Sequence, residues 1–255
     1  MRTPAGDAPI QVLAPDWPAP QNVRAAFTLR TGGVSAPPFD SLNVGAHVGD
    51  TTVAVLENRR RLRAELHLPA EPAWIEQVHG TAVVDLDVLP EGNATGVRAD
   101  AVVSRRAGRV CVVQVADCLP VLFAARDGSV VAAAHAGWRG LAAGVLEASV
   151  AELDTDPAKL LVWLGPAIGR EHFEVGNEVR AAFVGRDPEA TQAFVANARG
   201  RWLCDLAALA RQRLAALGVT QAFGGHWCTY ADPARFFSHR RDGQCGRMAA
   251  LLWLS

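Results

Sequence analysis

The feature that most constrains the fold is a dense succession of short apolar or alternating runs in the middle of the chain. Turn residues such as Gly108 and the Asp127-Gly128 pair separate several of them. Runs of this length and density are typical of strands. They predict a mixed or antiparallel sheet core. The runs are 73–78, 81–86, 99–103, 110–115, 119–125 and 130–135.

Further strands and several helices flank this region. In 53–66, Val55, Leu62 and Leu66 share one helical face, and the arginines lie mostly around the other. Strands and helices do not alternate strictly, which predicts an α/β fold with a mixed sheet, flanking helices and α+β-like layering in a single domain. The remaining expected elements are strands at 23–30, 160–165 and 250–255, and helices at 140–153, 176–185 and 205–217.

No linker or repeat divides the chain, so we expect one catalytic domain over 1–255 with an irregular N-terminal lead-in at 1–22. Residues 31–50 show no periodicity and are rich in Gly, Pro, Ser and Asn, which indicates a long irregular loop. A loop of this length inside a compact domain is usually functional.

Charge and cysteine content exclude several classes of protein. The formal net charge is −1, so there is no basic excess for nucleic acid or an anionic membrane. The most apolar stretch, 110–125, is interrupted by polar residues and is too short to span a bilayer. The N-terminus lacks an apolar signal segment, and five cysteines argue against a disulfide framework. We expect a cytoplasmic protein with reduced thiols.

Three apolar runs end at or near a residue that could bind a metal: His79, Cys118 and His135. Two imidazoles and a thiolate suit zinc, and three protein ligands leave a fourth position for water. The separations of 39 and 17 residues match no local zinc motif. Spacing alone therefore leaves other interpretations open: Cys118 as a nucleophile with a histidine base, or three ordinary core residues.

Other segments carry weaker signals. HAGWRG (135–140) joins a strand to a helix, where backbone N–H groups and Arg139 could hold an anion, although an ordinary turn with Trp138 in the core explains it equally well. Asp117 could orient a ligand or cap a turn. Three cysteines in apolar or strand-like surroundings are expected to be buried and inert: Cys111, Cys204 and Cys228.

Eight segments, in order, resemble a known bacterial family. It is the laccase-domain family, once described as multi-copper polyphenol oxidoreductases and now as purine nucleoside phosphorylases and, in some members, as a peptidoglycan editing factor. The resemblance runs from about Thr28 to about Leu252. The segments are TLRTGGVSAPPFDSLNVGAHVGD, ENRRRL, EQVHG, ADCLPVLF, AAAHAGWRG, GPAIG, FEVGNEV and CTYADPARFFSHRRDGQCGRMAALL.

The resemblance implies a single-domain α/β fold and a zinc site made of the EQVHG histidine, His79, the ADC cysteine, Cys118, and the HAGWRG histidine, His135. Copper is an alternative metal for the same atoms. The implied activities are phosphorolysis of adenosine, inosine and methylthioadenosine, and deamination of adenosine. The implied partners are purine nucleosides and phosphate, with no nucleic acid and no membrane.

Phosphorolysis also requires donors for phosphate. From their positions in the matched segments we expect Arg59, Arg139 and Arg240 to contact phosphate, and Asn43 to contact the nucleoside. The chain departs from the family pattern at two places in the C-terminal segment. His239 stands where a tyrosine is expected, and Cys245 stands where a threonine is expected.

The sequence therefore favours a zinc-dependent purine nucleoside phosphorylase with adenosine deaminase activity. The alternative is a cysteine hydrolase or amidase acting on cell-wall precursors, with Cys118 as nucleophile. A binding module with a vestigial site is less favoured, because the histidines, cysteine and arginines are intact. Laccase chemistry is disfavoured because the trinuclear centre of multi-copper oxidases uses H-x-H pairs, and the chain has none.

Overall fold

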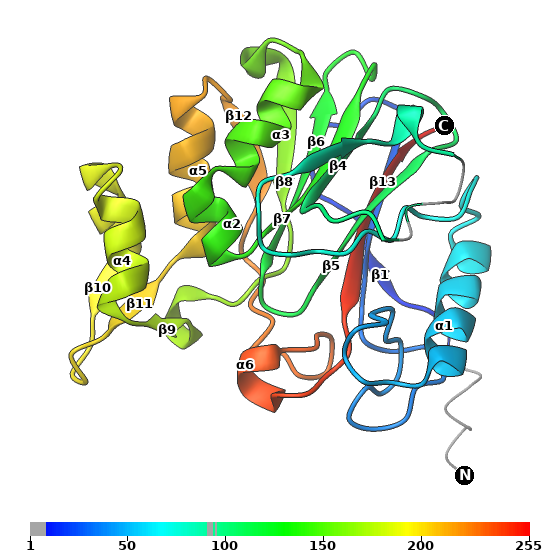
Figure 1. The fold of residues 1–255 in the computed structure, drawn as a ribbon, viewed down its shortest axis with the longest axis horizontal. Coiled ribbons are helices and arrows are strands. Elements are labelled where there is room, and N and C mark those ends of the chain that lie inside the picture. Colours follow the sequence, from blue (N-terminus) through cyan, green and yellow to red (C-terminus); the bar gives the residue numbers. More distant parts are fainter. Residues whose placement is uncertain (1–8, 91–93, 95) are drawn as a thin grey trace.

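A six-stranded mixed sheet forms the centre of the protein (Figure 1). The structure is a computed structural model that describes residues 9–90, 94 and 96–255. Most neighbouring strands of this sheet are antiparallel, but β12 is parallel to β8 and β3 is parallel to β4. In spatial order the strands are β12 (Gln221–Gly224), β8 (Leu160–Leu164), β6 (Leu119–Ala125), β7 (Val131–Ala136), β4 (Ala101–Ser104) and β3 (Val83–Asp85).

Two smaller sheets complete the strand content of the described residues. The four-stranded sheet is antiparallel throughout, and its order is β1 (Val12–Leu13), β2 (Val23–Thr28), β13 (Met248–Leu254) and β5 (Val110–Val115). The three-stranded sheet consists of β10 (Phe194–Ala196), β11 (Trp202–Cys204) and β9 (Glu174–Val175). The strand nearest the C-terminus, β13, thus lies between two strands from much earlier in the chain.

The helices cover the sheets from outside. Figure 1 shows α2, α3 and α5 on one side of the six-stranded sheet, α4 beside the three-stranded sheet, and α1 at the opposite end of the molecule. The α-helices are α1 (Thr52–Glu65), α2 (Trp138–Ala143), α3 (Val145–Leu153), α4 (Asn177–Val184), α5 (Leu206–Ala216) and α6 (His239–Asp242). Short 3-10 turns occur at Leu86–Val88, Pro157–Lys159, Arg170–His172 and Pro188–Ala193.

Side-chain alternation along the central strands builds two apolar layers. On β6, Val121 and Phe123 pack toward the helices, whereas Leu122 packs into the layer between the two larger sheets. A strand places successive side chains on opposite faces, so a strand with apolar residues at every position is covered on both sides. A third cluster lies on the outer face of the four-stranded sheet, against Leu62 of α1.

The structure confirms the predicted mixed α/β fold and most of its central elements. The predicted strand at 73–78 is wrong, because only Glu76 forms a bridge, to Arg98. The single helix predicted for 140–153 is two helices, interrupted at Gly144, whose φ is +112°. The lead-in is not wholly irregular, since it contains β1. Residues 1–8 of the lead-in lie outside the described part of the chain.

Four further strands, β9, β10, β11 and β12, were not predicted from the sequence. These strands have two to four residues each, and β10 carries two exposed side chains, so no apolar run marks them. Within the described residues, we find no helix with the length and apolar character needed to cross a membrane.

Candidate metal centre and the adjoining cavity

Three side chains that are distant in sequence meet at one end of the central sheet. His135 lies on β7, Cys118 precedes β6, and His79 lies in the segment before β3. One ligand atom from each lies within 4.8 Å of the others, and His79 Nε2 is 3.8 Å from Cys118 Sγ. In a tetrahedral zinc site, a sulfur and a nitrogen ligand are roughly 3.5 Å apart. The trio could therefore hold a metal ion with little adjustment.

The carboxylate of Asp100 organises two of these ligands. It is fully buried just before β4, and it accepts a hydrogen bond from His135 Nδ1 at 2.8 Å. It also accepts the backbone N–H groups of Val78, His79 and Gly80, at 3.2, 2.9 and 2.6 Å. With Nδ1 bonded to a carboxylate, His135 presents Nε2 to a metal, the usual arrangement for a ligating histidine. Asp100 was not among the residues predicted from the sequence.

Backbone conformation also shapes the centre. His79 has a φ of +59°, and Asp117, directly before Cys118, has a φ of +85°. Residues other than glycine rarely adopt such angles, and when they do they cluster at functional sites. At Gly137, a Cβ would lie 2.9 Å from Cys118 Sγ and 3.0 Å from His79 Cδ2. Only a glycine leaves room for the ligands there.

The charges around Cys118 favour its thiolate, which is the form that binds a metal. Burial alone would raise the pKa of Cys118, but His135 and His79 outweigh it and lower that pKa to about 6. Burial would lower the pKa of His135, but the Cys118 thiolate and the Asp100 carboxylate raise it. The metal-free pair is thus a thiolate beside an imidazolium. Binding of a metal would release the imidazolium proton, since a ligating histidine must be neutral.

The donor set fits the metal that the resemblance implies. Two nitrogens and one sulfur are borderline-soft ligands suited to zinc, and three protein ligands are the number found in catalytic zinc sites. Copper also binds imidazole and thiolate, so the donor atoms support a metal centre without fixing the metal.

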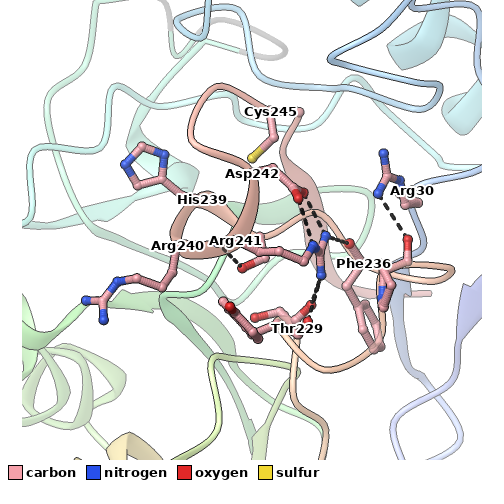
Figure 2. Close-up of polar contacts among 12 residues, drawn as sticks. Arg30, Thr229, Phe236, His239, Arg240, Arg241, Asp242 and Cys245 are labelled. Carbon is pink, nitrogen blue, oxygen red and sulfur yellow. Dashed lines mark hydrogen bonds and ion pairs between the residues drawn. The ribbon is translucent and has the colours of Figure 1, made fainter. Parts of the chain in front are cut away.

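Asp117 ties the turn before Cys118 to the C-terminal loop. Its carboxylate accepts hydrogen bonds from Thr229 Oγ1 and from the backbone N–H of Arg240, both at 2.6 Å. Figure 2 shows the loop itself gathered around Arg241, whose guanidinium donates to the carbonyls of Thr229 and Phe236 and to Asp242. Asp117 therefore positions Cys118 through the backbone and does not bond a ligand side chain.

The two departures from the family pattern lie on opposite sides of this loop. His239 is exposed, and its Nδ1 is 2.6 Å from the carbonyl oxygen of Gly243. Figure 2 shows His239 and Arg240 pointing away from the Arg241 cluster. Cys245 is buried in the layer between the sheets, and burial raises the pKa of its thiol.

The other cysteines are partly as predicted. Cys111 and Cys204 are fully buried, and burial raises the pKa of both thiols, that of Cys204 to about 12. Cys228 is only half-buried, contrary to the prediction, and its sulfur accepts a hydrogen bond from the backbone N–H of Gly169 at 3.2 Å.

The three predicted phosphate-binding arginines each have different neighbours. Arg59 on α1 donates from Nε and Nη2 to the Val44 carbonyl and lies over the Trp74 ring at 4.0 Å. Burial, partly offset by Glu71, lowers the pKa of Arg59 to about 10, so it remains a cation at neutral pH. Arg139 is exposed and stacks on Trp138.

Arg240 lines a separate cavity of about 560 Å³, together with Tyr230 and His172. Its guanidinium donates to the Glu174 carbonyl at 2.9 Å and lies 5.2 Å from the centre of the Phe173 ring. Arg59 and Arg240 thus line different cavities, and their contacts with phosphate stay predictions, as does that of Arg139.

Asn43 is fully buried inside the 31–50 loop. Its amide nitrogen donates to the Gly45 carbonyl and to Asp50. Its amide oxygen accepts the backbone N–H groups of Gly45 and Arg247, both at 2.9 Å. In this conformation Asn43 shapes the loop, and the predicted contact with a nucleoside requires the loop to move.

A cavity of about 350 Å³ adjoins the segment that leads to His79. This size suits a small-molecule ligand. His47 lines this cavity. Burial lowers its pKa, and the charges of Arg247, Arg59, His135 and His79 lower it further. The cavity was not predicted from the sequence, and its polar and aromatic walls are His47, Arg59, Trp74, Glu76 and Gln114.

Comparison with known proteins gives a consistent result. The family described as multi-copper polyphenol oxidoreductase laccase matches residues 24–255. A protein of Pseudomonas aeruginosa named purine nucleoside phosphorylase is 56% identical over 243 residues, covering 95% of this chain and 98% of the relative. The purine nucleoside phosphorylase YfiH of Escherichia coli is 53% identical over 244 residues, covering 96% of this chain and 99% of the relative.

Solved structures show the same fold. A Neisseria meningitidis protein matches with a TM-score of 0.91 and 47% identity, covering 96% of this chain and 99% of that protein. YlmD from Geobacillus stearothermophilus matches with a TM-score of 0.87 and 34% identity, covering 96% of this chain and 98% of that protein.

Proposed function

The chain belongs to the family described as multi-copper polyphenol oxidoreductase laccase, and on that premise we propose that it is a zinc-dependent purine nucleoside phosphorylase. We propose adenosine, inosine and methylthioadenosine as its substrates and deamination of adenosine as a second activity. The observation that carries the proposal is that relatives with 45–56% identity over nearly their whole length are named purine nucleoside phosphorylases. We also propose that the chain forms one catalytic domain and that the protein is cytoplasmic.

The roles of the ligands follow from the geometry of the centre. His79, Cys118 and His135 would hold the zinc, with Asp100 fixing the ring of His135 and the backbone around His79. When bound, a zinc ion in such a site supplies Lewis-acid chemistry. The protein's own contribution is a rigid set of donors, because both the buried carboxylate and the crowding at Gly137 restrict ligand movement.

Phosphorolysis breaks the bond from the ribose C1′ to the purine, forms a bond from C1′ to a phosphate oxygen, and leaves a proton to be supplied to the purine. Phosphate needs a cation near the ribose. Among the three candidates, Arg59 is favoured because it lines the cavity near the metal centre. Arg139, beside Gly137, and Arg240, joined to Asp117 through its backbone, remain proposed contacts, as does Asn43 for the nucleoside.

The family description does not make this chain a laccase. A His₂Cys trio resembles a blue-copper centre, but a trinuclear copper centre uses paired histidines in H-x-H segments, and the sequence contains none. We therefore propose no oxidase role.

One observation favours the alternative, a cysteine hydrolase. The pKa of Cys118 is lowered to about 6, and a thiolate beside an imidazolium is the form in which a cysteine attacks an amide. The two proposals differ in their need for metal and phosphate.

The test is an assay of inosine cleavage with and without phosphate, on protein purified without chelator and analysed for bound metal. Hypoxanthine release that needs phosphate, and that is lost together with the metal in Cys118→Ala, is the expected result. Cys228→Ala, which removes a half-buried thiol elsewhere, is the matched control and should keep both. Absence of metal and of phosphate dependence would reject the phosphorylase. Activity that survives loss of metal would favour the hydrolase.

A further inference from the structure

Gln114 on β5 lies at the wall of the cavity of about 350 Å³ that Arg59 and Trp74 also line, and its side-chain amide oxygen is buried without a partner. The residue is 6% exposed, and its Oε1 has no hydrogen-bond partner. Its Nε2 donates to none of the described residues. A buried acceptor that is left without a donor costs free energy. A ligand that offers a matching donor and acceptor would recover that loss.

The position of Gln114 is fixed by the segment that carries His79. The side chain of Gln77, two residues before His79, accepts the backbone N–H of Gln114 at 2.7 Å and donates to its carbonyl at 2.8 Å. Gln114 is also four residues before Cys118, so the extended chain between them is at most about 13 Å long. A ligand that contacts Gln114 in the cavity therefore lies near the part of the chain that carries Cys118.

The rest of the cavity suits a planar group. The Arg59 guanidinium lies over the Trp74 ring and is held by the Val44 carbonyl, which makes a flat and rigid wall. Guanidinium and indole planes are surfaces on which a heterocyclic base stacks.

From these contacts we infer that Gln114 binds the edge of the purine that carries the substituent at position 6. The inference rests on the proposed function for the identity of the ligand. A glutamine amide offers one donor and one acceptor side by side, and it pairs with the N6 and N7 atoms of adenine in this way. Hypoxanthine offers a matching pair when the amide is rotated by 180°, so that its oxygen accepts from N1–H and its nitrogen donates to O6. Gln114 therefore favours binding of both 6-amino and 6-oxo purine nucleosides over nucleosides whose purine carries an apolar group at position 6.

The test compares the equilibrium affinities of inosine and 6-methylpurine riboside, without phosphate, by titration of the intact protein. The unmodified protein should bind inosine about tenfold more tightly, the size expected for losing a hydrogen bond to a buried group. In Gln114→Met the two affinities should agree within about twofold, because the side chain offers no hydrogen bond. A ratio of affinities is independent of the fraction of protein that is folded.

Two further variants make the result specific. Gln221→Met on β12 is the matched control, since Gln221 also has a buried Oε1 without a partner but lies on the six-stranded sheet, away from the cavity. It should keep the tenfold preference. Gln114→Asn keeps an amide but shortens it, and it should lose the preference as Gln114→Met does.

The outcomes separate this inference from the proposed function. No preference in the unmodified protein, no binding of either nucleoside, or an unchanged preference in Gln114→Met would overturn the assignment of Gln114. If the preference behaves as expected but phosphate does not cleave inosine, the assignment of Gln114 stands and the phosphorylase proposal fails. If inosine is cleaved and the preference is unchanged in Gln114→Met, the phosphorylase proposal stands alone.

Discussion

A single carboxylate, Asp100, holds two of the three metal ligands in place. It bonds the His135 ring and three successive backbone N–H groups around His79. Burial would raise the pKa of Asp100, but these hydrogen bonds hold it below its ordinary value. Asp100 therefore stays ionised, and it would act on a bound metal through both histidines.

We expect Asp100→Asn to weaken zinc binding by about 10- to 100-fold, the usual effect of changing a residue that holds a metal ligand. The new amide group would face backbone N–H groups that need an acceptor. Zinc affinity measured by competition with a chromophoric chelator tests this. Asp87→Asn is the control, because Asp87 also accepts two hydrogen bonds near β4, from Ser104 and Arg105, without touching a ligand. Equal affinities in the two variants would contradict the role of Asp100.

The thiol of Cys118 gives a second prediction, for metal-free protein. Because its pKa is lowered to about 6, the thiol is deprotonated above that pH, and its alkylation rate should rise as the pH passes through about 6. His135→Asn removes the largest neighbouring contribution and should move the rise toward the ordinary thiol range. The measurement is the rate of iodoacetamide labelling of Cys118 by mass spectrometry from pH 5 to 10. A rise centred near pH 9 in the unmodified protein would contradict the electrostatics described above.

Some residues of the site could be predicted from the sequence and others could not, for physical reasons. His79, Cys118 and His135 were visible because each lies at or near the end of an apolar run. Asp100 was not, because its partners lie 20 to 35 positions away and only β4 pairing with β7 brings it beside His135. Gln114 is one of the polar residues that interrupt the apolar stretch 110–125, and a sequence does not show that such a group faces a cavity.

At the scale of elements, prediction succeeded where a long apolar pattern exists and failed where the backbone or a side chain interrupts it. The run at 73–78 looks like a strand, yet Gln77 bonds the main chain of β5 through its side chain rather than through its backbone. The segment 140–153 has a continuous helical pattern, but Gly144 takes a left-handed conformation that divides it into α2 and α3.

The division of the helix at Gly144 predicts the direction in which a substitution there changes the free energy of unfolding. Gly144→Ala should lower the free energy of unfolding by roughly 1–2 kcal/mol, because a Cβ is disfavoured in the left-handed conformation, although its nearest contact would be an ordinary 3.5 Å to Glu147. In a continuous helix the same change would raise stability by about 0.5–1 kcal/mol. Urea unfolding distinguishes the two, and an increase in stability would show that α2 and α3 form one helix in solution.

At the scale of the whole molecule, the metal centre depends on the completed sheet. Its ligands are separated by 39 and 17 residues and meet only when β4, β6 and β7 have paired. The unfolded chain therefore has no comparable site, and a metal that binds only the folded state stabilises it.

We expect chelation to lower the melting temperature of the unmodified protein and to leave that of Cys118→Ala unchanged. At a metal concentration one hundred times the dissociation constant, the stabilisation is about 2.7 kcal/mol. Differential scanning calorimetry, with and without a chelator and then with added zinc, measures it. An equal loss in both proteins would mean that the stabilising metal lies elsewhere.

The place of β13 in the four-stranded sheet has a consequence for synthesis on the ribosome. β2 and β5 do not pair with each other, since residues 248–254 lie between them. Until that segment has emerged, both strands present open edges, and such edges invite pairing with other chains. A nascent chain of this protein is thus prone to aggregate until β13 has paired with β2 and β5. Translation that stops short of residue 248 would leave a product that stays prone to aggregate.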